Sequence, residues 1–258
     1  MQVWHMNGAG NDFMVMDARD QELDFSQLAK KLCKLTGADG FMAVDESAIA
    51  DLRLHFYNSD GSRGEMCGNG SRCVCAFAYE NGIASEQMAV QTDAGIIYGS
   101  RLGENRYQVE LNLPSVMDLH RTEDSAYVEL GDPGVPHAVT ELPELRWEQQ
   151  ESYRKKGVSL RYDPAFPKGA NVNFFTRLDE ENVRVLTYER HVEDFTLACG
   201  TGCASIACVL WTKGQLPEGK LVAHNRGGTL IVTVESDGTK IRRLLQEGPV
   251  EVTKIYEL

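Results

Sequence analysis

One short pattern occurs twice in this chain of 258 residues. The first copy, M-C-G-N-G-S-R-C, contains Cys67 and the second, A-C-G-T-G-C-A-S, contains Cys199, 132 positions later (199 − 67 = 132). Each cysteine precedes a Gly-x-Gly pattern and a small, apolar run at helical spacing. Each run closes on a glycine at the same offset, Gly82 and Gly214 (82 − 67 = 15; 214 − 199 = 15), as expected for a helix C-cap. An internal repeat of this kind decides the architecture before any single motif does.

The same register continues in both directions, which a chance match would not do. Strand-like runs, D-L-R-L-H-F-Y and E-N-V-R-V-L-T-Y, precede the two cysteines and lead into polar loops. Glycines also recur at offsets of −30 and +28 from each cysteine: Gly37 with Gly169, and Gly95 with Gly227. The repeat predicts two related α/β halves, each a set of strands around one central helix that begins after a C-G-x-G turn.

The boundary between the halves is expected at the crossover L-N-L-P-S-V. The first half covers residues 1–116 and the second 117–247. The final G-P-V-E-V-T-K-I-Y-E-L is strand-like, so residues 248–258 are expected to return to the first half.

Charge and hydropathy exclude several classes of function. A net charge of −12 argues against a nucleic-acid binder or a partner of acidic membranes, because both need a basic face. No apolar run approaches the roughly 18 to 20 residues of a membrane span, and the N-terminal sequence lacks the pattern of a signal peptide. A cytoplasmic location is therefore expected.

The seven cysteines are odd in number and clustered, so they are interpreted as reduced thiols. Their spacings differ from the C-x2-C pairs of structural zinc sites, so no metal is expected. Five of them fall within apolar helical runs and are expected to be packing residues: Cys33, Cys73, Cys75, Cys203 and Cys208.

Cys67 and Cys199 differ from the other five because each is expected at a helix N-terminus. The helix dipole and unpaired N–H groups there favour thiolate over thiol, which makes the cysteine a competent base. The neighbouring glycines let an α-carboxylate approach the backbone closely. If two such loops faced each other across the seam, one thiolate could remove an α-proton while the opposing thiol protonated the other face. That pair of transfers inverts the configuration at carbon.

The motifs resemble those of the diaminopimelate epimerases, in family order through nearly the whole chain. They are M-N-G-A-G-N-D-F from Met6, G-A-D-G from Gly37, N-S-D-G-S from Asn58, M-C-G-N-G-S-R-C, G-V-P-H from Gly134, G-A-N-V-N-F-F from Gly169, Y-E-R from Tyr188 and A-C-G-T-G. A single C-G-x-G would be weak evidence, whereas this ordered set with both cysteines is specific.

The resemblance implies two pseudo-symmetric domains, each a curled mixed sheet around a central helix, with the active site in the cleft between them. It implies a cofactor-independent two-base isomerase that converts LL- to meso-diaminopimelate for lysine and peptidoglycan synthesis. The partner it implies is a small amino-acid substrate, together with a second copy in a homodimer. The acid–base pair would be Cys67 and Cys199, with proton movement helped by His137 and Glu189.

The resemblance also implies which residues bind the substrate. Positions that hold the reacting α-carboxylate and α-amino groups would be Gly68, Asn69, Gly200 and Thr201. Positions that hold the distal end of the substrate would be Asn11, Asn58, Asn171 and Arg190. Taken singly, Asn58 could be a turn residue, His137 a loop histidine and Arg190 a surface charge.

Three residues depart from the family pattern. Val135 stands where many members have asparagine, His191 replaces a glycine, and Phe195 replaces a glutamate. Because the last two flank Arg190 and Cys199, they could reshape the distal pocket. A related racemase with a glutamate-like or other substrate therefore stays an alternative.

Other classes of protein stay open at this stage. They are a thiol-redox or metal-binding protein, a proline racemase or phenazine-pathway isomerase of the same fold, and a scaffold that only binds. The retained cysteines, His137 and Glu189 favour catalysis, because a pure binder would not need them.

Overall fold

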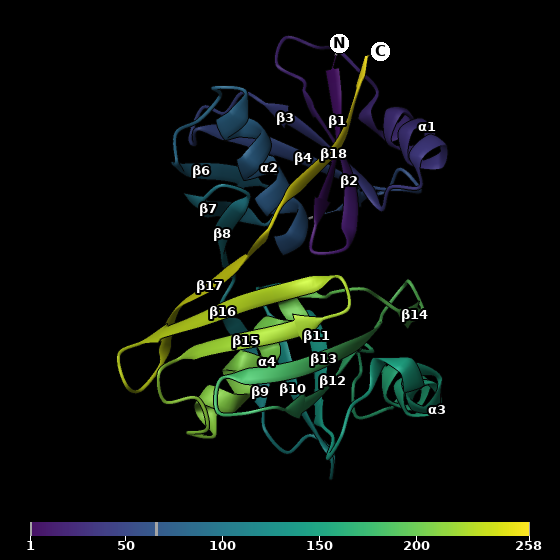
Figure 1. Ribbon diagram of the computed structural model, residues 1–258, viewed down its shortest axis with the longest axis vertical. Helices are drawn as coiled ribbons and strands as arrows, with labels where there is room; N and C mark the ends of the chain where they lie inside the picture. The colour runs from purple at the N-terminus through teal and green to yellow at the C-terminus, as the bar shows by residue number, and fades with distance from the viewer. Residues whose placement is uncertain (1, 65–66, 258) are drawn as a thin grey trace. The chain divides into compact units, whose positions relative to one another are not determined.

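The computed structural model describes residues 2–64 and 67–257, and its contacts divide the chain into two compact units (Figure 1). Unit 1 comprises Met1–Glu110 and Glu247–Leu258, and unit 2 comprises Leu111–Gln246.

Unit 1 is a mixed sheet with two helices. Along the chain, β1 pairs antiparallel with β2, β2 parallel with β3, β3 antiparallel with β4, β4 parallel with β6, and β6 antiparallel with β7. The C-terminal strand β18 pairs antiparallel with β1. The elements are β1 (Gln2–Gly8), β2 (Asn11–Asp17), α1 (Phe25–Thr36), β3 (Gly40–Asp45), β4 (Leu52–Asn58), β5 (Arg63–Gly64), α2 (Gly68–Glu80), β6 (Gln87–Thr92), β7 (Gly95–Gly103), β8 (Arg106–Leu111) and β18 (Glu251–Glu257).

Unit 2 repeats the pairing pattern step for step. The pairs β10–β11, β11–β12, β12–β13, β13–β15 and β15–β16 are antiparallel, parallel, antiparallel, parallel and antiparallel. The repeat seen in the sequence is therefore a repeat of topology. The elements are β9 (Pro114–Asp118), β10 (Ser125–Leu130), β11 (Val135–Glu141), η1 (Trp147–Gln149), α3 (Gln150–Arg161), β12 (Asn171–Arg177), β13 (Asn182–Glu189), β14 (Asp194–Phe195), α4 (Gly200–Thr212), β15 (Lys220–Asn225), β16 (Gly228–Ser236) and β17 (Ile241–Pro249).

The central helices α2 and α4 are both 13 residues long and almost wholly buried. Small and apolar residues make up most of both helices, and the polar Asn69 and Arg72 of α2 are buried in contact with each other. Strands β1, β2, β3 and β7 contact α2, and strands β9 to β12, β15 and β16 contact α4. Each sheet therefore wraps around its own helix, which confirms the expected fold class.

Both central helices end in the same hydrogen-bonded turn. Gly82, at φ 66°, donates its N–H to Tyr79, and Ile83 donates to Ala78. Gly214, at φ 68°, takes the same place after α4. This is the Schellman arrangement, in which glycine adopts the left-handed conformation at little cost. The predicted helix ends are thus confirmed.

Each unit also has a second helix on another face of its sheet, which the sequence analysis did not anticipate. Helix α1 contacts β2, β3 and β4, and α3 contacts β12 and β13 (Figure 1). Asp24 caps α1 by accepting the N–H of Gln27 at 3.1 Å, and Gly37 ends it at φ 79°. In the described part of the chain, no helix has the length and apolar character needed to cross a bilayer.

Candidate active site

Cys67 and Cys199 are the N-cap residues of α2 and α4. Both have extended backbones, with φ −137° and −125°, and their carbonyls accept the first helical N–H groups at 2.7 and 3.0 Å. Cys67 is half-buried, whereas Cys199 is 7% exposed. The structure therefore puts both cysteines where the repeat predicts them.

The groups around the sulfur of Cys199 have opposite effects on the pKa of its thiol. Its Sγ is 3.6 Å from Oγ1 of Thr201. Burial raises the pKa of Cys199 well above its ordinary value, and the nearby Glu189 carboxylate adds to this rise. The Thr201 hydroxyl and the Gly202 N–H act in the opposite direction and are outweighed. Burial and the Glu189 carboxylate therefore favour the protonated thiol of Cys199, against the thiolate that a helix N-terminus favours.

The first turn of α2 brings two predicted binding residues together. Asn69 is 2% exposed, and its Nδ2 donates to Oδ1 of Asn11 at 2.7 Å. Its own Oδ1 accepts from Nη2 of Arg72 at 3.0 Å. A Cβ added to Gly8 would lie 2.6 Å from the Asn69 carbonyl oxygen, so the β1–β2 turn packs closely on this end of the helix. Gly68 precedes Asn69 and is buried.

Asn58 closes a turn near the same end of the unit 1 sheet. Its N–H donates to the Ser62 carbonyl at 2.8 Å and its Nδ2 to the Ser62 hydroxyl at 3.0 Å. The next residue, Ser59, donates to the carbonyl of Asp39, whose carboxylate accepts from Asn11. Asn58 is exposed, and its contacts are those of a turn residue.

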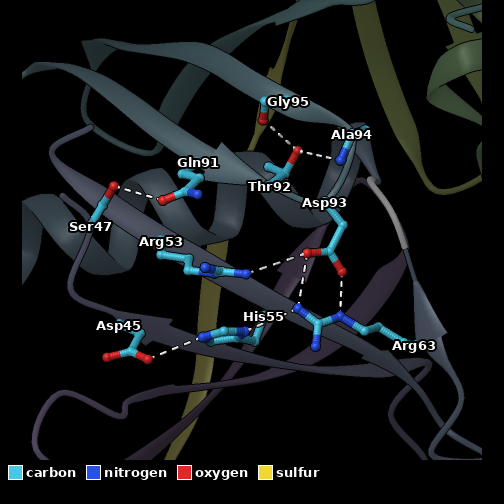
Figure 2. Close-up of polar contacts among 10 residues, drawn as sticks. All are labelled: Asp45, Ser47, Arg53, His55, Arg63, Gln91, Thr92, Asp93, Ala94 and Gly95. Carbon is cyan, nitrogen blue, oxygen red and sulfur yellow. Dashed lines mark hydrogen bonds and ion pairs between the residues drawn. The ribbon is translucent and has the colours of Figure 1, made fainter. Parts of the chain in front are cut away.

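Strand β5 leads into the Cys67 loop and is held by charged groups (Figure 2). The Arg63 guanidinium donates two hydrogen bonds to the Asp93 carboxylate, from Nε to Oδ2 and from Nη2 to Oδ1, the second at 2.9 Å. Nη2 of Arg63 also contacts Nδ1 of His55. The other ring nitrogen of His55, Nε2, lies 3.1 Å from Oδ2 of Asp45. The strand before Cys67 is therefore tied to the β6–β7 turn and to β3. Residues 65–66, between β5 and Cys67, lie outside the described residues.

In unit 2 the predicted polar residues gather at one end of three neighbouring strands. His137 in β11 is the register partner of Asn171, the first residue of β12. Oδ1 of Asn171 accepts the N–H of Arg190 at 2.8 Å, and Glu189 ends β13 directly before Arg190. The fold thus brings His137, Asn171, Glu189 and Arg190 to one sheet end. Gly200 and Thr201 form the first turn of α4 in the same unit.

Burial lowers the pKa of both His137 and Arg190. His137 is fully buried, and this burial lowers its pKa to about 3, with the Arg190 guanidinium acting in the same direction. Burial, and then the neighbouring Arg161, lower the pKa of Arg190. Nη1 of Arg190 donates to the Lys168 carbonyl at 3.1 Å, while its Nε is buried without a partner among the described residues. His137 is therefore a neutral imidazole, and Arg190 is a cation with an unused donor.

Asn173, which the sequence motifs did not single out, is fully buried beside His137. Its Nδ2 lies 3.1 Å from Nδ1 of His137. The signal was present in the alternation N-V-N, because residues two apart on a strand share a face. Asn171 and Asn173 therefore share one face of β12.

The two departures from the family pattern near Arg190 lie in different surroundings. His191 is exposed and adopts φ 72°, the left-handed region that favours glycine. Phe195 is 7% exposed and meets Tyr188 edge-on at 5.4 Å between ring centroids. The Arg154 guanidinium covers its ring at 5.4 Å. Phe195 is therefore a core residue of unit 2, and its effect on the distal pocket stays a prediction. Val135 opens β11, two residues before His137.

Comparisons with known proteins show which family has this architecture. The family model for diaminopimelate epimerase matches residues 3–112 and 131–253. The chain belongs to the diaminopimelate epimerase family. A diaminopimelate epimerase from Nitratiruptor is 37% identical over 260 residues, covering all of this chain and 97% of the relative. One from Aquifex aeolicus is 34% identical over 259 residues, covering 93% of this chain and 92% of the relative.

Solved structures show that the diaminopimelate epimerase fold is shared more widely. A phenazine biosynthesis protein of the PhzF family from Bacillus anthracis matches with a TM-score of 0.74 at 14% identity, covering 100% of this chain and 98% of the other. A probable proline racemase from Agrobacterium radiobacter matches with a TM-score of 0.70 at 14% identity, covering 100% and 92%. At this identity the likeness concerns the fold alone.

Proposed function

We propose that this chain is a diaminopimelate epimerase, an isomerase that interconverts the LL and meso forms without a cofactor. The reaction serves the synthesis of lysine and peptidoglycan precursors. One observation carries the proposal: two cysteines cap two helices of equal length, buried in two copies of one fold, in a chain of this family. A single reactive cysteine could remove a proton, but inversion needs a second proton-transfer group.

The proposed chemistry assigns opposite roles to the two sulfurs. Cys67, as thiolate, takes the α-hydrogen as a proton, and the electron pair of the broken C–H bond stays on carbon. Cys199 then gives its thiol proton to the opposite face, which leaves a thiol on Cys67 and a thiolate on Cys199. The raised pKa of Cys199 supports its role as the acid of this direction. The reverse reaction exchanges the roles.

The remaining site residues support the carbanion and the substrate. N–H groups of the two first turns stabilise the developing charge on the α-carboxylate, because helix N-termini favour anions. These positions are Gly68, Asn69, Gly200 and Thr201. His137 and Glu189 move protons to and from the thiols. Groups that bind the distal end are Asn11, Asn58, Asn171 and Arg190, of which Arg190 has a buried, unused Nε–H for an acidic group.

The test is α-proton exchange in D2O with a panel of amino acids. We expect exchange and epimerisation with diaminopimelate, and loss of epimerisation in both Cys67→Ala and Cys199→Ala. Cys208→Ala is the matched control, because Cys208 is a buried cysteine of α4 away from its N-terminus. No exchange with diaminopimelate, or full activity in either cysteine variant, would overturn the proposal.

A related racemase with a changed substrate is the second candidate, and it rests on Val135. The asparagine amide that many family members have at this position is absent, so one polar contact with the substrate is lost. The same panel separates the candidates, because exchange with glutamate and none with diaminopimelate would favour the second. We also propose a cytoplasmic homodimer, for which light scattering after gel filtration gives the mass.

A further inference from the structure

Asn173 joins three parts of unit 2 through one buried amide. Its Oδ1 accepts the hydroxyl proton of Thr187 in β13 at 3.0 Å. Its Nδ2 lies 3.1 Å from three atoms: Nδ1 of His137, the carbonyl of Ala138 and the carbonyl of Asn171. Every polar atom of this side chain therefore has a partner within hydrogen-bonding distance.

These contacts fix which end of the amide faces His137. If the amide were rotated by 180°, its oxygen would lie about 3.1 Å from two carbonyl oxygens, and its nitrogen would face the Thr187 hydroxyl. Carbonyl oxygens only accept hydrogen bonds, so the oxygen of the rotated amide would face two other acceptors at close range and repel them. The NH₂ end therefore faces the imidazole.

An NH₂ group beside Nδ1 fixes the tautomer of His137. An amide nitrogen donates two hydrogen bonds and accepts none. An N–H at Nδ1 would therefore face a donor, whereas an Nδ1 lone pair shares the two amide protons with the two carbonyls. In a neutral imidazole the proton then sits on Nε2. This Nε2 is buried and has no hydrogen-bond partner among the described residues. The imidazole thus has one N–H donor that no described residue accepts and that a bound molecule could accept.

Unit 1 shows that packing alone does not require a polar pair here. The second glycine of its C-G-N-G motif, Gly70, faces Met42 of β3 and Phe13 of β2. In unit 2 the corresponding Gly202 faces Asn173 of β12, whose Oδ1 would lie 2.0 Å from an added Cβ. The same layer is apolar in one unit and polar in the other. Asn173 is therefore explained by His137 and not by the fold.

We propose that Asn173 is a positioning residue that holds His137 as the neutral tautomer with its proton on Nε2, so that this N–H serves the proton transfers of the site. The inference rests on the proposed function for its catalytic consequence. Its structural part, the tautomer, stands independently. Asn173 acts through His137 and the Gly202 turn, which place it between the imidazole and the Cys199 helix.

The first measurement reads the tautomer directly. Protein labelled with ¹⁵N-histidine is observed by long-range ¹H–¹⁵N NMR, with His137→Gln used to assign the signal. We expect wild type to show a protonated Nε2 and an unprotonated Nδ1. Asn173→Asp should move the proton to Nδ1, because a carboxylate accepts where the amide donates. Asn173→Leu removes the donor and should give a mixture of tautomers, and it keeps the test informative if the aspartate variant unfolds.

The second measurement is epimerisation of diaminopimelate. We expect kcat of both Asn173 variants to fall about 10²- to 10⁴-fold, the size of a general acid–base contribution, with little change in KM. Asn225→Leu is the matched control, since it removes another buried amide of unit 2 that contacts Cys203 and Ala223. Its kcat should stay near that of wild type.

The outcomes separate the two proposals. Wild type that shows a protonated Nε2 but does not act on diaminopimelate refutes the proposed function and leaves the assigned tautomer standing. Wild type with a protonated Nδ1 overturns the inference, whatever its activity. Asn173→Asp that keeps the Nε2 proton, or that moves it without lowering kcat, overturns it as well.

Discussion

Replacing Gly202 with alanine should destabilise this protein much more than the same change at Gly70. A Cβ at Gly202 would lie 2.0 Å from Oδ1 of Asn173, so the amide must move away. The amide is fixed by contacts with Thr187 and His137 and with two backbone carbonyls. Each buried polar group that loses its partner costs about 1–3 kcal/mol, so two such losses amount to about 2–6 kcal/mol.

At Gly70 the added Cβ would lie 1.9 Å from Cε of Met42, the far end of a flexible side chain. Overpacking of this kind costs about 1–3 kcal/mol. The higher helix propensity of alanine returns up to about 1 kcal/mol at either site. We therefore expect Gly202→Ala to lower the free energy of unfolding by about 2 kcal/mol more than Gly70→Ala.

Urea denaturation followed by fluorescence measures the two free energies. Hydrogen exchange of peptides from α2 and α4 assigns each loss to its helix. Gly202→Ala should also expose the α4 peptide to faster exchange and lower the epimerase activity. Equal losses at the two glycines, or a larger loss at Gly70, would refute the reasoning that Asn173 is rigidly held.

Three further predictions concern titration and backbone strain. His191→Gly should raise the free energy of unfolding by about 1 kcal/mol in urea, because glycine removes the strain at φ 72°; a decrease would contradict this. Stability should rise as pH increases from about 3 to 6.5, by up to about 1.4 kcal/mol per pH unit, since in this window the unfolded chain protonates His137 and the folded chain does not; His137→Gln should flatten the slope in acid-range urea titrations. Iodoacetamide should label Cys199 slowly at pH 7, because burial raises the pKa of its thiol and keeps the thiolate scarce; rapid labelling at this pH, read by mass spectrometry, would contradict the raised pKa.

The sequence predicted those parts of the fold that depend on local signals. The beginnings and ends of α2 and α4 follow from a cysteine cap and a closing glycine, and both are read within a few positions of the chain. Helix α1 has an equally local signal, since Asp24 caps its first turn and Gly37 ends it. This helix lies outside the repeated segments around the two cysteines, so the repeat did not predict it.

The properties of the site depend on burial, which one sequence does not reveal. The helix terminus favours a thiolate at Cys199, whereas burial inside unit 2 raises the pKa of its thiol. Phe195 replaces a glutamate beside the site in sequence, yet its side chain points into the core against Tyr188. Asn173 gains its importance from contacts with Thr187 and Ala138, which lie 14 and 35 positions away along the chain. These contacts exist only after the strands pair.

In both α2 and α4, the number of residues between the cysteine cap and the closing glycine fixes the direction in which the cysteine points. Every helical residue turns the chain by about 100° and advances it by 1.5 Å. A single residue inserted within either helix, between its cap and its closing glycine, would therefore swing the sulfur to another side of the helix while the packed end stayed in place. Insertions elsewhere, such as in the exposed turn at Asp237 to Lys240, do not change the direction of either cysteine. Tolerance to insertions should thus be lowest in two 13-residue segments.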